Sequence, residues 1–428
     1  MQPPRAMVIV GAGHAGGRAA QTLRELGWTG PIVMVGAEPA LPYERPPLSK
    51  GLLTGEQDAA STALRPPMAW DTDQIAHVVA WVESIDTARR EVVITGGPQR
   101  AGRRIAYEAL LLATGGHLRR LAIPGADLPG VLGLRTLDDA AQLAARLVPG
   151  ARLAIVGGGF IGLEVAASAR QRGCEVTVIE GAPRLLGRAV PAAIGERVLA
   201  LHRAHGVEIR LGTPPRSIAR GTDGRGLRVA LGDGSVLEAD TVVVGIGIEP
   251  ATELAVQAGL QVRRGIVVDA HLATSCAGVY AAGDVAEGPS PLGGPPIRQE
   301  TWQNAEAQAR VAAANMLGRG VRCDAMPWFW SDQYDHQIQV SGEPALGATT
   351  VTRPLGEGGQ GGEGTPIAPI AQIDFHLDAA GRLVGVSGFG PTRIVAREMK
   401  LARMLVERRR QPAPQALADP AVKLRSLI

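Results

Sequence analysis

Short apolar runs alternate with glycine-rich turns along the first fifty residues. Residues 7–10 are apolar and lead into the turn Gly11-Ala12-Gly13-His14-Ala15-Gly16, after which residues 18–26 have a helix-forming composition that Gly27 ends. A second apolar run, 32–35, is followed by Glu38. This order predicts strand, turn, helix and strand, which is the fingerprint of a dinucleotide site. In such a site glycines let backbone N–H groups approach a pyrophosphate, and the carboxylate accepts hydrogen bonds from a ribose.

The same order of positions returns in the second third of the chain. The apolar run 153–156 leads into Gly157-Gly158-Gly159-Phe160-Ile161-Gly162, a helix is predicted as far as Arg172, and the run 176–179 ends at Glu180. Two fingerprints are much stronger than one, because a single match arises easily in a chain with 56 glycines. A carboxylate at Glu180 favours a free 2′-hydroxyl over a 2′-phosphate, which predicts NADH rather than NADPH as the second nucleotide. The alternative is that Glu180 only ends a surface strand.

Three further apolar runs have the pattern of buried strands. The run 109–112 is stopped by Ala113-Thr114-Gly115-Gly116, and the run 241–244 is stopped by Gly245-Ile246-Gly247. Each predicts a strand on which the chain leaves one nucleotide-binding domain for another. The segment 278–284 ends at Asp284, a carboxylate at a strand tip that is suited to binding a sugar-alcohol chain.

The last third of the chain is less regular. Residues 287–296 are rich in proline and glycine and predict a loop, whereas residues 301–317 are alanine-rich and predict a helix. From about residue 325 the turn signals become more frequent, which indicates an α+β region. Within it, residues 356–364 are of low complexity, and we interpret them as a flexible loop of unknown purpose rather than a phosphate site.

Charge and composition exclude several classes of partner. The 428 residues include 44 basic and 41 acidic side chains, and no block of like charge exceeds residues 408–410, so a nucleic-acid partner is not indicated. No apolar run approaches the ~18 residues of a membrane span. The first motif begins at Gly11, which argues against a cleaved secretory signal. We therefore expect a cytoplasmic protein that has neither a nucleic-acid nor a membrane partner.

Cysteine and lysine are both scarce. Cys174, Cys276 and Cys323 are far apart and form no Cys-x-x-Cys or Cys/His pair, so neither a disulfide framework nor a metal site is predicted. Of the 44 basic residues only Lys50, Lys400 and Lys423 are lysines, and Lys50 lies in a proline-stiffened segment.

Three longer segments carry a resemblance to a known family. They are Pro42-Tyr43-Glu44-Arg45-Pro46-Pro47-Leu48-Ser49-Lys50, Leu134-Arg135-Thr136-Leu137-Asp138-Asp139-Ala140 and Trp328-Phe329-Trp330-Ser331-Asp332-Gln333-Tyr334. With the two fingerprints, their order resembles the putidaredoxin-reductase-like, FAD-dependent NADH:ferredoxin reductases of cytochrome P450 and Rieske oxygenase systems.

The resemblance implies an α/β fold of the glutathione-reductase type with two Rossmann-like domains and a C-terminal α+β domain. Residues 1–117 and 248–324 would bind FAD, residues 118–247 would bind NADH, and residues 325–428 would form the third domain. The residues implied for FAD are Gly11, Gly13, His14, Ala15, Gly16, Glu38, Arg45, Lys50, Val82, Ala113, Thr114, Gly115, Arg135, Asp284, Glu300, Thr301, Trp302 and Trp330. Those implied for NADH are Gly157, Gly159, Phe160, Ile161, Gly162, Glu164, Glu180, Arg188 and Gly247.

Lys50 and Glu164 stand out within these sets as the candidate catalytic residues. The resemblance implies that they meet beside the flavin ring, with Lys50 donating near the reactive nitrogen and Glu164 countering its charge. Burying such a pair costs several kcal/mol per ion before compensation, so stability alone does not explain it. The alternatives are that Glu164 only complements the helix dipole and that Lys50 lies at the surface.

The resemblance further implies that electrons pass from NADH to FAD and then singly to an acidic [2Fe–2S] ferredoxin. We expect this ferredoxin to dock near Arg310, on the alanine-rich helix, and Trp330, which the resemblance places close to the flavin. The alternatives are that Trp330 is an ordinary core aromatic and that Arg310 lies on a solvated helix face. Flavin disulfide reductases and single-cysteine NADH oxidases or peroxidases share the layout, but they need thiols beside the flavin, and no cysteine precedes Cys174. A second alternative is an NADH-sensing flavoprotein that resembles apoptosis-inducing factor and acts through interactions.

Overall fold

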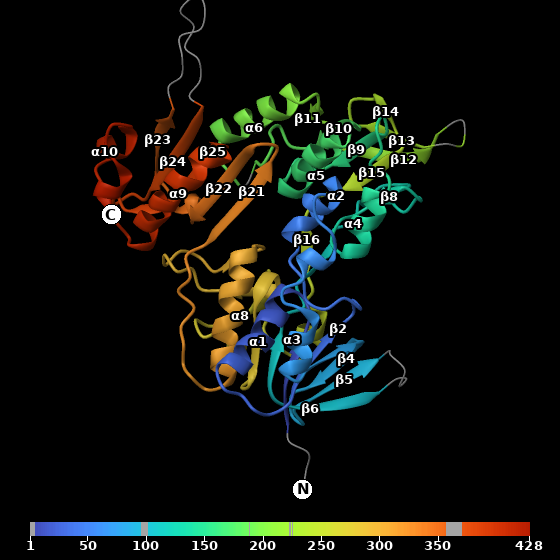
Figure 1. Cartoon of the computed structure of the whole chain (residues 1–428), viewed down its shortest axis with the longest axis vertical. Helices are drawn as coiled ribbons and strands as arrows, with labels where there is room; N and C mark the ends of the chain where they lie inside the picture. The colour runs from blue at the N-terminus through green and yellow to red at the C-terminus, as the bar shows by residue number, and fades with distance from the viewer. Residues whose placement is uncertain (1–4, 96–101, 188, 222–223, 225, 357–369) are drawn as a thin grey trace, which may run out of the picture. The chain divides into compact units, whose positions relative to one another are not determined.

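The computed structural model describes residues 5–95, 102–187, 189–221, 224, 226–356 and 370–428. Within them the chain forms two compact units (Figure 1). The first contains residues 1–45, 59–117 and 248–325, and the second contains residues 46–58, 118–247 and 326–428. Residues 46–58, which the sequence prediction assigns to the first domain, pack in the second unit because α2 (Gly51–Thr54) lies against α4 (Leu137–Ala144) and α5 (Phe160–Gln171).

The first unit is built around a seven-stranded sheet in the order β3-β2-β1-β6-β5-β4, with β18 also paired to β6. Its strands are β1 (Ala6–Val10), β2 (Ile32–Gly36), β3 (Ile75–Val79), β4 (Trp81–Asp86), β5 (Glu91–Thr95), β6 (Arg103–Leu112) and β18 (Val279–Ala281). The pairs among β3, β2, β1, β6 and β18 are parallel, whereas β4 and β5 continue the sheet antiparallel from the start of β6. β6 therefore begins earlier than its apolar run predicts, because its polar first half pairs with β5.

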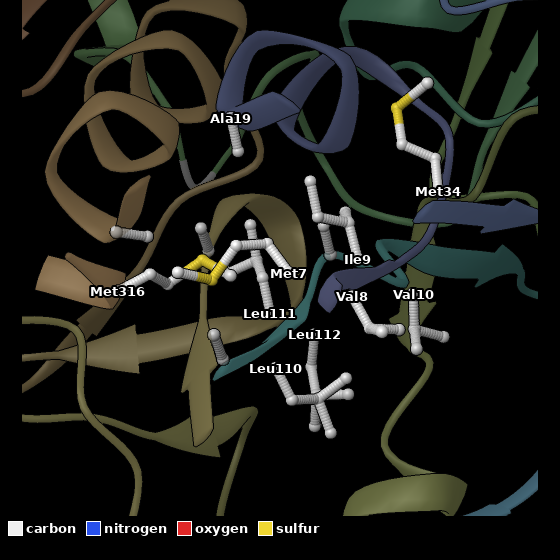
Figure 2. Close-up of a cluster of buried hydrophobic side chains, with 14 of the residues drawn as sticks. Met7, Val8, Ile9, Val10, Ala19, Met34, Leu110, Leu111, Leu112 and Met316 are labelled. Carbon is white, nitrogen blue, oxygen red and sulfur yellow. The ribbon is translucent and has the colours of Figure 1, made fainter. Parts of the chain in front are cut away.

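Helices α1 (His14–Glu25) and α8 (Trp302–Met316) pack against each other in this unit. The side chains of β1 point alternately to the two sides of the sheet, with Val8 and Val10 on one side and Ile9 on the other (Figure 2). All three are buried, as expected for a parallel strand covered on both faces. The remaining elements of the unit are η2 (Ala60–Thr62), α3 (Pro67–Thr72), β7 (Gly116–Leu118), β16 (Ile248–Pro250), α7 (Glu253–Gln257), β17 (Ile266–Val267), η3 (Gly283–Val285), β19 (Ala286–Gly288) and β20 (Ile297–Arg298).

The second unit contains a parallel sheet in the order β11-β10-β9-β15-β8. Its strands are β8 (Val131–Leu132), β9 (Arg152–Val156), β10 (Glu175–Glu180), β11 (Glu208–Leu211) and β15 (Thr241–Val244). An antiparallel sheet of β12 (Pro215–Arg220), β13 (Leu227–Leu231) and β14 (Val236–Ala239) follows β11 in the chain. Helix α5 connects β9 to β10, and α6 (Ala192–Ala204) connects β10 to β11. This is the βαβ order predicted from the second fingerprint.

The rest of the second unit is an antiparallel sheet in the order β21-β22-β25-β24-β23, packed against α9 (Thr392–Glu407). Its strands are β21 (Trp328–Gln333), β22 (His336–Gly342), β23 (Thr349–Leu355), β24 (Ala371–Leu377) and β25 (Leu383–Pro391). The short helices of this unit are η1 (Pro46–Ser49), η4 (Pro344–Leu346), α10 (Pro414–Ala418) and η6 (Leu424–Leu427).

The predicted fold class, two Rossmann-like domains with a C-terminal α+β domain, is confirmed. Most of the low-complexity segment 356–364 lies outside the described residues, so its interpretation as a flexible loop stays a prediction. Among the helices that are described, none is both long enough and apolar enough to cross a membrane.

Candidate functional site

The first glycine turn is shaped by close backbone contacts. A Cβ atom at Gly11, whose φ is +107°, would lie 2.1 Å from the carbonyl oxygen of Ala113, and one at Gly16 would lie 1.9 Å from the carbonyl oxygen of Gly11. Because neither glycine has a Cβ atom, the start of α1 can approach β1 closely. The helix therefore begins at His14 rather than after the last glycine. At Gly13 the nearest atom to an added Cβ would be a guanidinium nitrogen of Arg45, 3.7 Å away. The middle glycine thus leaves space at the N-terminus of α1.

Glu38 follows β2 and lies close to this turn. Tyr43 donates its hydroxyl to one Glu38 oxygen at 2.5 Å, and the Arg45 guanidinium donates to the other at 2.8 Å. Asp284, which lies in η3 shortly after β18, also attracts Arg45 electrostatically. A Cβ atom at the neighbouring Gly283 would lie 3.1 Å from the Ala15 side chain. The structure therefore gathers the predicted acids Glu38 and Asp284 around the N-terminus of α1.

His14, the first residue of α1, connects the turn to α8. Its ring meets that of Trp302 edge-on, with centroids 5.1 Å apart, and its Nε2 lies 3.0 Å from Glu306. The Arg18 Nε donates to the same Glu306 oxygen at 2.6 Å. Burial alone would raise the pKa of Glu306, but hydrogen bonds from His14, Arg310 and Arg18 outweigh it and lower this pKa to about 2. Glu306 is therefore an ionised anchor between α1 and α8.

Five other predicted residues of the first unit have contacts that stabilise the fold. Thr301 caps α8 through a hydrogen bond from the Asn304 N–H. Thr114 donates its hydroxyl to the Ala251 carbonyl at 2.7 Å, and the Gly115 carbonyl accepts from the Ala251 N–H. Val82 lies opposite Ile94 in the β4–β5 pairing and packs on the core. Glu300 forms an ion pair with Arg298. Their roles in cofactor binding stay predictions.

The second glycine turn repeats the geometry of the first. A Cβ atom at Gly157, whose φ is +114°, would lie 2.5 Å from the Gly245 carbonyl oxygen, and one at Gly162 would lie 2.1 Å from the Gly157 carbonyl oxygen. At Gly159 an added Cβ would meet nothing within 4 Å. Of the side chains that the structure describes, none caps α5, and its first turn has no acidic residue. Both features suit an anion at a helix N-terminus.

Glu180 lies at this turn and not at an isolated strand end. One of its oxygens accepts from the Gly158 N–H and the other from the Ala182 N–H, both at 2.7 Å. Beyond the turn, Ile161 is 46% exposed, whereas the Phe160 ring packs edge-on against Phe329.

Two other residues belong to the predicted NADH set. Gly247 has φ +99° and accepts from the Arg119 N–H at 3.0 Å, and Arg188 lies outside the described residues.

Lys50 and Glu164 meet, as the resemblance implies. The Lys50 Nζ lies 3.1 Å from Glu164 Oε1, and the Glu164 side chain is only 4% exposed. Ser331 donates its hydroxyl to the same oxygen at 2.6 Å, and Ser49 donates to Oε2 at 2.5 Å. Ser168, one turn along α5, donates to the Ser49 carbonyl and fixes that segment. The buried carboxylate thus has a charged partner and two hydroxyl donors, as a buried ion requires.

Three predicted residues have only partly defined roles. Arg135 precedes the capping box of α4, and its N–H donates to Asp139 at 2.9 Å. Trp330 stacks on Trp328 and donates its indole N–H to Asp332 at 2.9 Å. The predicted docking residue Arg310 is held by charge. Its guanidinium forms an ion pair with Glu306 at 2.8 Å and lies 3.9 Å from Glu25.

Four polar side chains at these sites are not among the residues predicted from the sequence: Tyr43, Ser49, Glu306 and Ser331. Tyr43, Ser49 and Ser331 stand inside the quoted family segments, so those segments were the available signal. Glu306 follows Trp302 by one helical turn, and only the packing of α8 on α1 reveals its role.

The two turns fit the pyrophosphates of two dinucleotides. In each, the first and third glycines are required by backbone contact, and the middle glycine leaves open the space into which helix N–H groups point. Within the described part of the chain, no three His, Cys, Asp or Glu side chains gather as metal ligands.

Comparison with known proteins agrees with this geometry. Residues 5–309 match the pyridine nucleotide-disulphide oxidoreductase family, and residues 328–428 match the reductase C-terminal family. The chain is 42% identical to the ferredoxin–NAD(+) reductase component of the anthranilate 1,2-dioxygenase system of Burkholderia cepacia, over 98% of each protein. It is also 42% identical to rhodocoxin reductase of Rhodococcus erythropolis, over 81% of this chain and 80% of that protein.

Solved structures give the same result. The covalent putidaredoxin reductase–putidaredoxin complex contains a chain with a TM-score of 0.90 and 34% identity, covering 100% of this chain and 98% of that one. The ferredoxin reductase for the CYP199A2 system of Rhodopseudomonas palustris has a TM-score of 0.89 and 35% identity, covering 99% of each chain. The chain therefore belongs to the pyridine nucleotide-disulphide oxidoreductase family, among its NAD-linked ferredoxin reductases.

Proposed function

We propose that this chain passes electrons from NADH through FAD, one at a time, to a small [2Fe–2S] ferredoxin that feeds a cytochrome P450 or a Rieske oxygenase. FAD and NAD(H) are the cofactors of its family. The observation that carries the proposal is the glycine turn that occurs once in each unit, with its close backbone contacts. Glu38 is held beside the first turn, and Glu180 is held at the second.

The residues of the first unit would hold FAD. The N–H groups of the Gly11 to Gly16 turn bind its pyrophosphate, Glu38 accepts from the adenosine ribose, and Asp284 accepts from the sugar-alcohol chain. His14, Ala15, Arg45, Val82, Ala113, Thr114, Gly115, Glu300, Thr301 and Trp302 complete the proposed lining. Arg45 keeps Glu38 oriented through the 2.8 Å ion pair.

The residues of the second unit would hold NADH and serve the reactive ring. The turn from Gly157 to Gly162 binds the NADH pyrophosphate, and Glu180 selects a free 2′-hydroxyl. Gly247 and Arg188 complete the proposed NADH set, and Arg135 and Trp330 are further FAD contacts. When bound, FAD supplies hydride acceptance from NADH and release of the two electrons singly. Lys50 would place a positive charge near the flavin ring, and Glu164 positions Lys50 through their ion pair.

The domain assignment follows from these roles. We assign FAD to residues 1–117 and 248–324, NADH to residues 118–247, and a C-terminal domain to residues 325–428. We also place the protein in the cytoplasm, where its NADH and ferredoxin would be found.

Thiol chemistry does not compete with this proposal. No cysteine precedes Cys174, and Cys174 is fully buried, where burial raises the pKa of its thiol. A redox-active thiol needs exposure and a lowered pKa. The NADH-sensing alternative is not favoured, since the full-length relatives are ferredoxin reductases.

The test is to purify the protein and measure its flavin and its turnover. We expect one FAD per chain, and NADH-driven cytochrome c reduction that rises steeply when a [2Fe–2S] ferredoxin from the same source is added. A colourless protein that takes up no flavin, or turnover that ignores every ferredoxin, would contradict the proposal.

We further propose that an acidic ferredoxin docks near Arg310 and Trp330. Arg310 is half-exposed and already pairs with Glu306, so a glutamate there would face two carboxylates and disturb the fold. Arg310→Gln is the cleaner variant. Because steering acts mainly on association, ferredoxin-dependent turnover should slow several-fold at low salt and depend less on salt, while flavin reduction by NADH stays unchanged.

Arg322→Gln is the matched control, since Arg322 is also exposed and lies 3.8 Å from Asp324. Equal slowing in both variants, or slower flavin reduction in Arg310→Gln, would show that the docking face lies elsewhere.

A further inference from the structure

A line of buried polar side chains runs through the second unit from Glu164. Ser331 donates to Glu164 at 2.6 Å, and the Gln333 amide nitrogen donates to the Ser331 hydroxyl oxygen at 3.1 Å. The Gln333 amide oxygen lies 2.8 Å from Nε2 of His202. All four residues, taken whole, are at most 3% exposed. They come from α5, β21 and α6, and nothing in the proposed function uses Gln333 or His202.

The alternation of β21 explains why these residues share one face. Phe329, Ser331 and Gln333 contact residues of α5 or α6. Trp328 and Trp330, at the intervening positions, stack on each other. A period of two therefore places both polar groups of the line on the same side of the strand.

The direction of every hydrogen bond follows from the carboxylate. An ionised Glu164 only accepts, so the single Ser331 proton must point to it. Ser331 can then only accept from Gln333, which fixes the amide with its nitrogen toward Ser331 and its oxygen toward His202. The amide oxygen needs a donor, so His202 carries its proton on Nε2.

His202 is suited to remain neutral in this line. Burial, helped by the nearby His205, outweighs the Gln333 hydrogen bond and lowers its pKa to about 4. Its Nδ1 then lacks a proton and faces the Tyr334 hydroxyl, which lies 3.5 Å away, at the long limit for a hydrogen bond. Tyr334 stacks on the exposed His205 with ring centroids 3.6 Å apart.

We propose that Ser331, Gln333 and His202 are positioning residues, which clamp the Glu164 carboxylate in one orientation and thereby fix the place of the Lys50 charge. Ser331 holds Oε1, which also receives Lys50 at 3.1 Å, while Ser49 holds Oε2. With both oxygens clamped, the carboxylate cannot rotate away from Lys50. The inference deepens the proposed function, because that function gives the Lys50 charge its purpose at the flavin.

The scarcity of lysine makes the proposal directly testable. The chain has only three lysines, and Lys400 and Lys423, which are both exposed, serve as internal references. The purified protein would be labelled with [ε-13C]lysine, and the Lys50 signal compared in wild type, Ser331→Ala and Gln333→Glu. Ser341→Ala is the matched control, since Ser341 is equally buried in the same sheet but donates only to the Pro327 carbonyl among the hydrogen bonds of the described residues.

We expect the Lys50 signal to shift in Ser331→Ala and in Gln333→Glu, and to stay in place in Ser341→Ala. Nitrogen-15 spectra of His202 should show the neutral Nε2–H tautomer at pH 7 in wild type, and protonation of both ring nitrogens in Gln333→Glu, whose new carboxylate attracts the charge. An unmoved Lys50 signal in Ser331→Ala, or the opposite His202 tautomer in wild type, would overturn the proposal.

A second measurement separates this inference from the proposed function. In protein that contains flavin, removal of the Ser331 hydroxyl leaves the Glu164 charge less compensated, so the midpoint potential of the flavin should fall in Ser331→Ala and not in Ser341→Ala. A protein that binds no flavin would refute the proposed function while the Lys50 shift still stands. If the midpoint potential of the flavin is the same in Ser331→Ala as in wild type, the link between these buried polar residues and the cofactor is refuted.

Discussion

At the scale of single residues, the two acids proposed for the ribose sites are held in different ways. Glu38 is oriented by the side chains of Tyr43 and Arg45. Glu180 is oriented by two backbone N–H groups, one of them from Gly158 inside the glycine turn. Glu180 therefore braces the turn, and under the proposed function it would also repel a 2′-phosphate, so its replacement should affect both functions.

We expect Glu180→Ala to reduce the preference for NADH over NADPH about tenfold or more, equivalent to about 1.4 kcal/mol or more. The affinity for NADH should also fall, because the Gly158 N–H loses its acceptor. Measuring kcat/KM with both nucleotides checks this. Glu175→Ala, at the exposed start of the same strand, is the control and should keep the wild-type ratio. An unchanged ratio in Glu180→Ala would show that another residue selects the nucleotide.

At the scale of elements, we expect the two βα turns to divide their glycines between packing and binding. The third glycine of the second turn has no room for a side chain, whereas the middle one faces open space. A methyl group at these two positions should therefore produce opposite results, although the chemical change is the same.

Gly162→Ala would bring a Cβ atom to 2.1 Å from the Gly157 carbonyl oxygen, so α5 and β9 must separate. We expect a loss of about 3 kcal/mol of stability or more. Gly159→Ala should fold normally, because its Cβ meets nothing within 4 Å, but it should lose NADH affinity because the methyl group occupies the proposed pyrophosphate space. Thermal unfolding and NADH titration together test the pair. Equal destabilisation in both variants would contradict this division of roles.

At the scale of the whole molecule, the two units contain ionisable groups that respond to acid in different ranges. His202, in the second unit, has its pKa lowered to about 4 by burial, below an unfolded value of about 6.5. Glu306, in the first unit, is stabilised as an anion by hydrogen bonds, which outweigh burial and lower its pKa to about 2. In both cases the unfolded state binds more protons within the range, so stability falls as the pH falls.

We expect the second unit to lose about 3 kcal/mol through His202 as the pH falls from about 6.5 to 4. The contribution of Glu306 in the first unit should be lost only between about pH 4.5 and 2. Hydrogen exchange followed by mass spectrometry separates the peptides of the two units. His202→Gln should reduce the loss of stability of the second unit and leave the loss in the first unit unchanged. Identical pH profiles of wild type and variant would count against the His202 assignment.

The amino-acid sequence alone predicted both fingerprints, the strands that feed them, and the positions of Glu38, Glu180 and Asp284. These features depend on spacings of a few residues up to about one βαβ unit, and the geometry of a strand, a turn and a helix converts such spacings into neighbouring positions. The resemblance also predicted the pairing of Lys50 with Glu164, because both lie in or beside recognised segments.

Only the tertiary structure decided what surrounds these groups. Ser331 reaches Glu164 across 167 residues of sequence, and His14 reaches Glu306 across 292. Neither contact follows from local periodicity, because it depends on which helix packs against which strand or helix after the chain has folded. A buried ion must find its partners wherever the packing supplies them, and those partners complete the site that the local motifs begin.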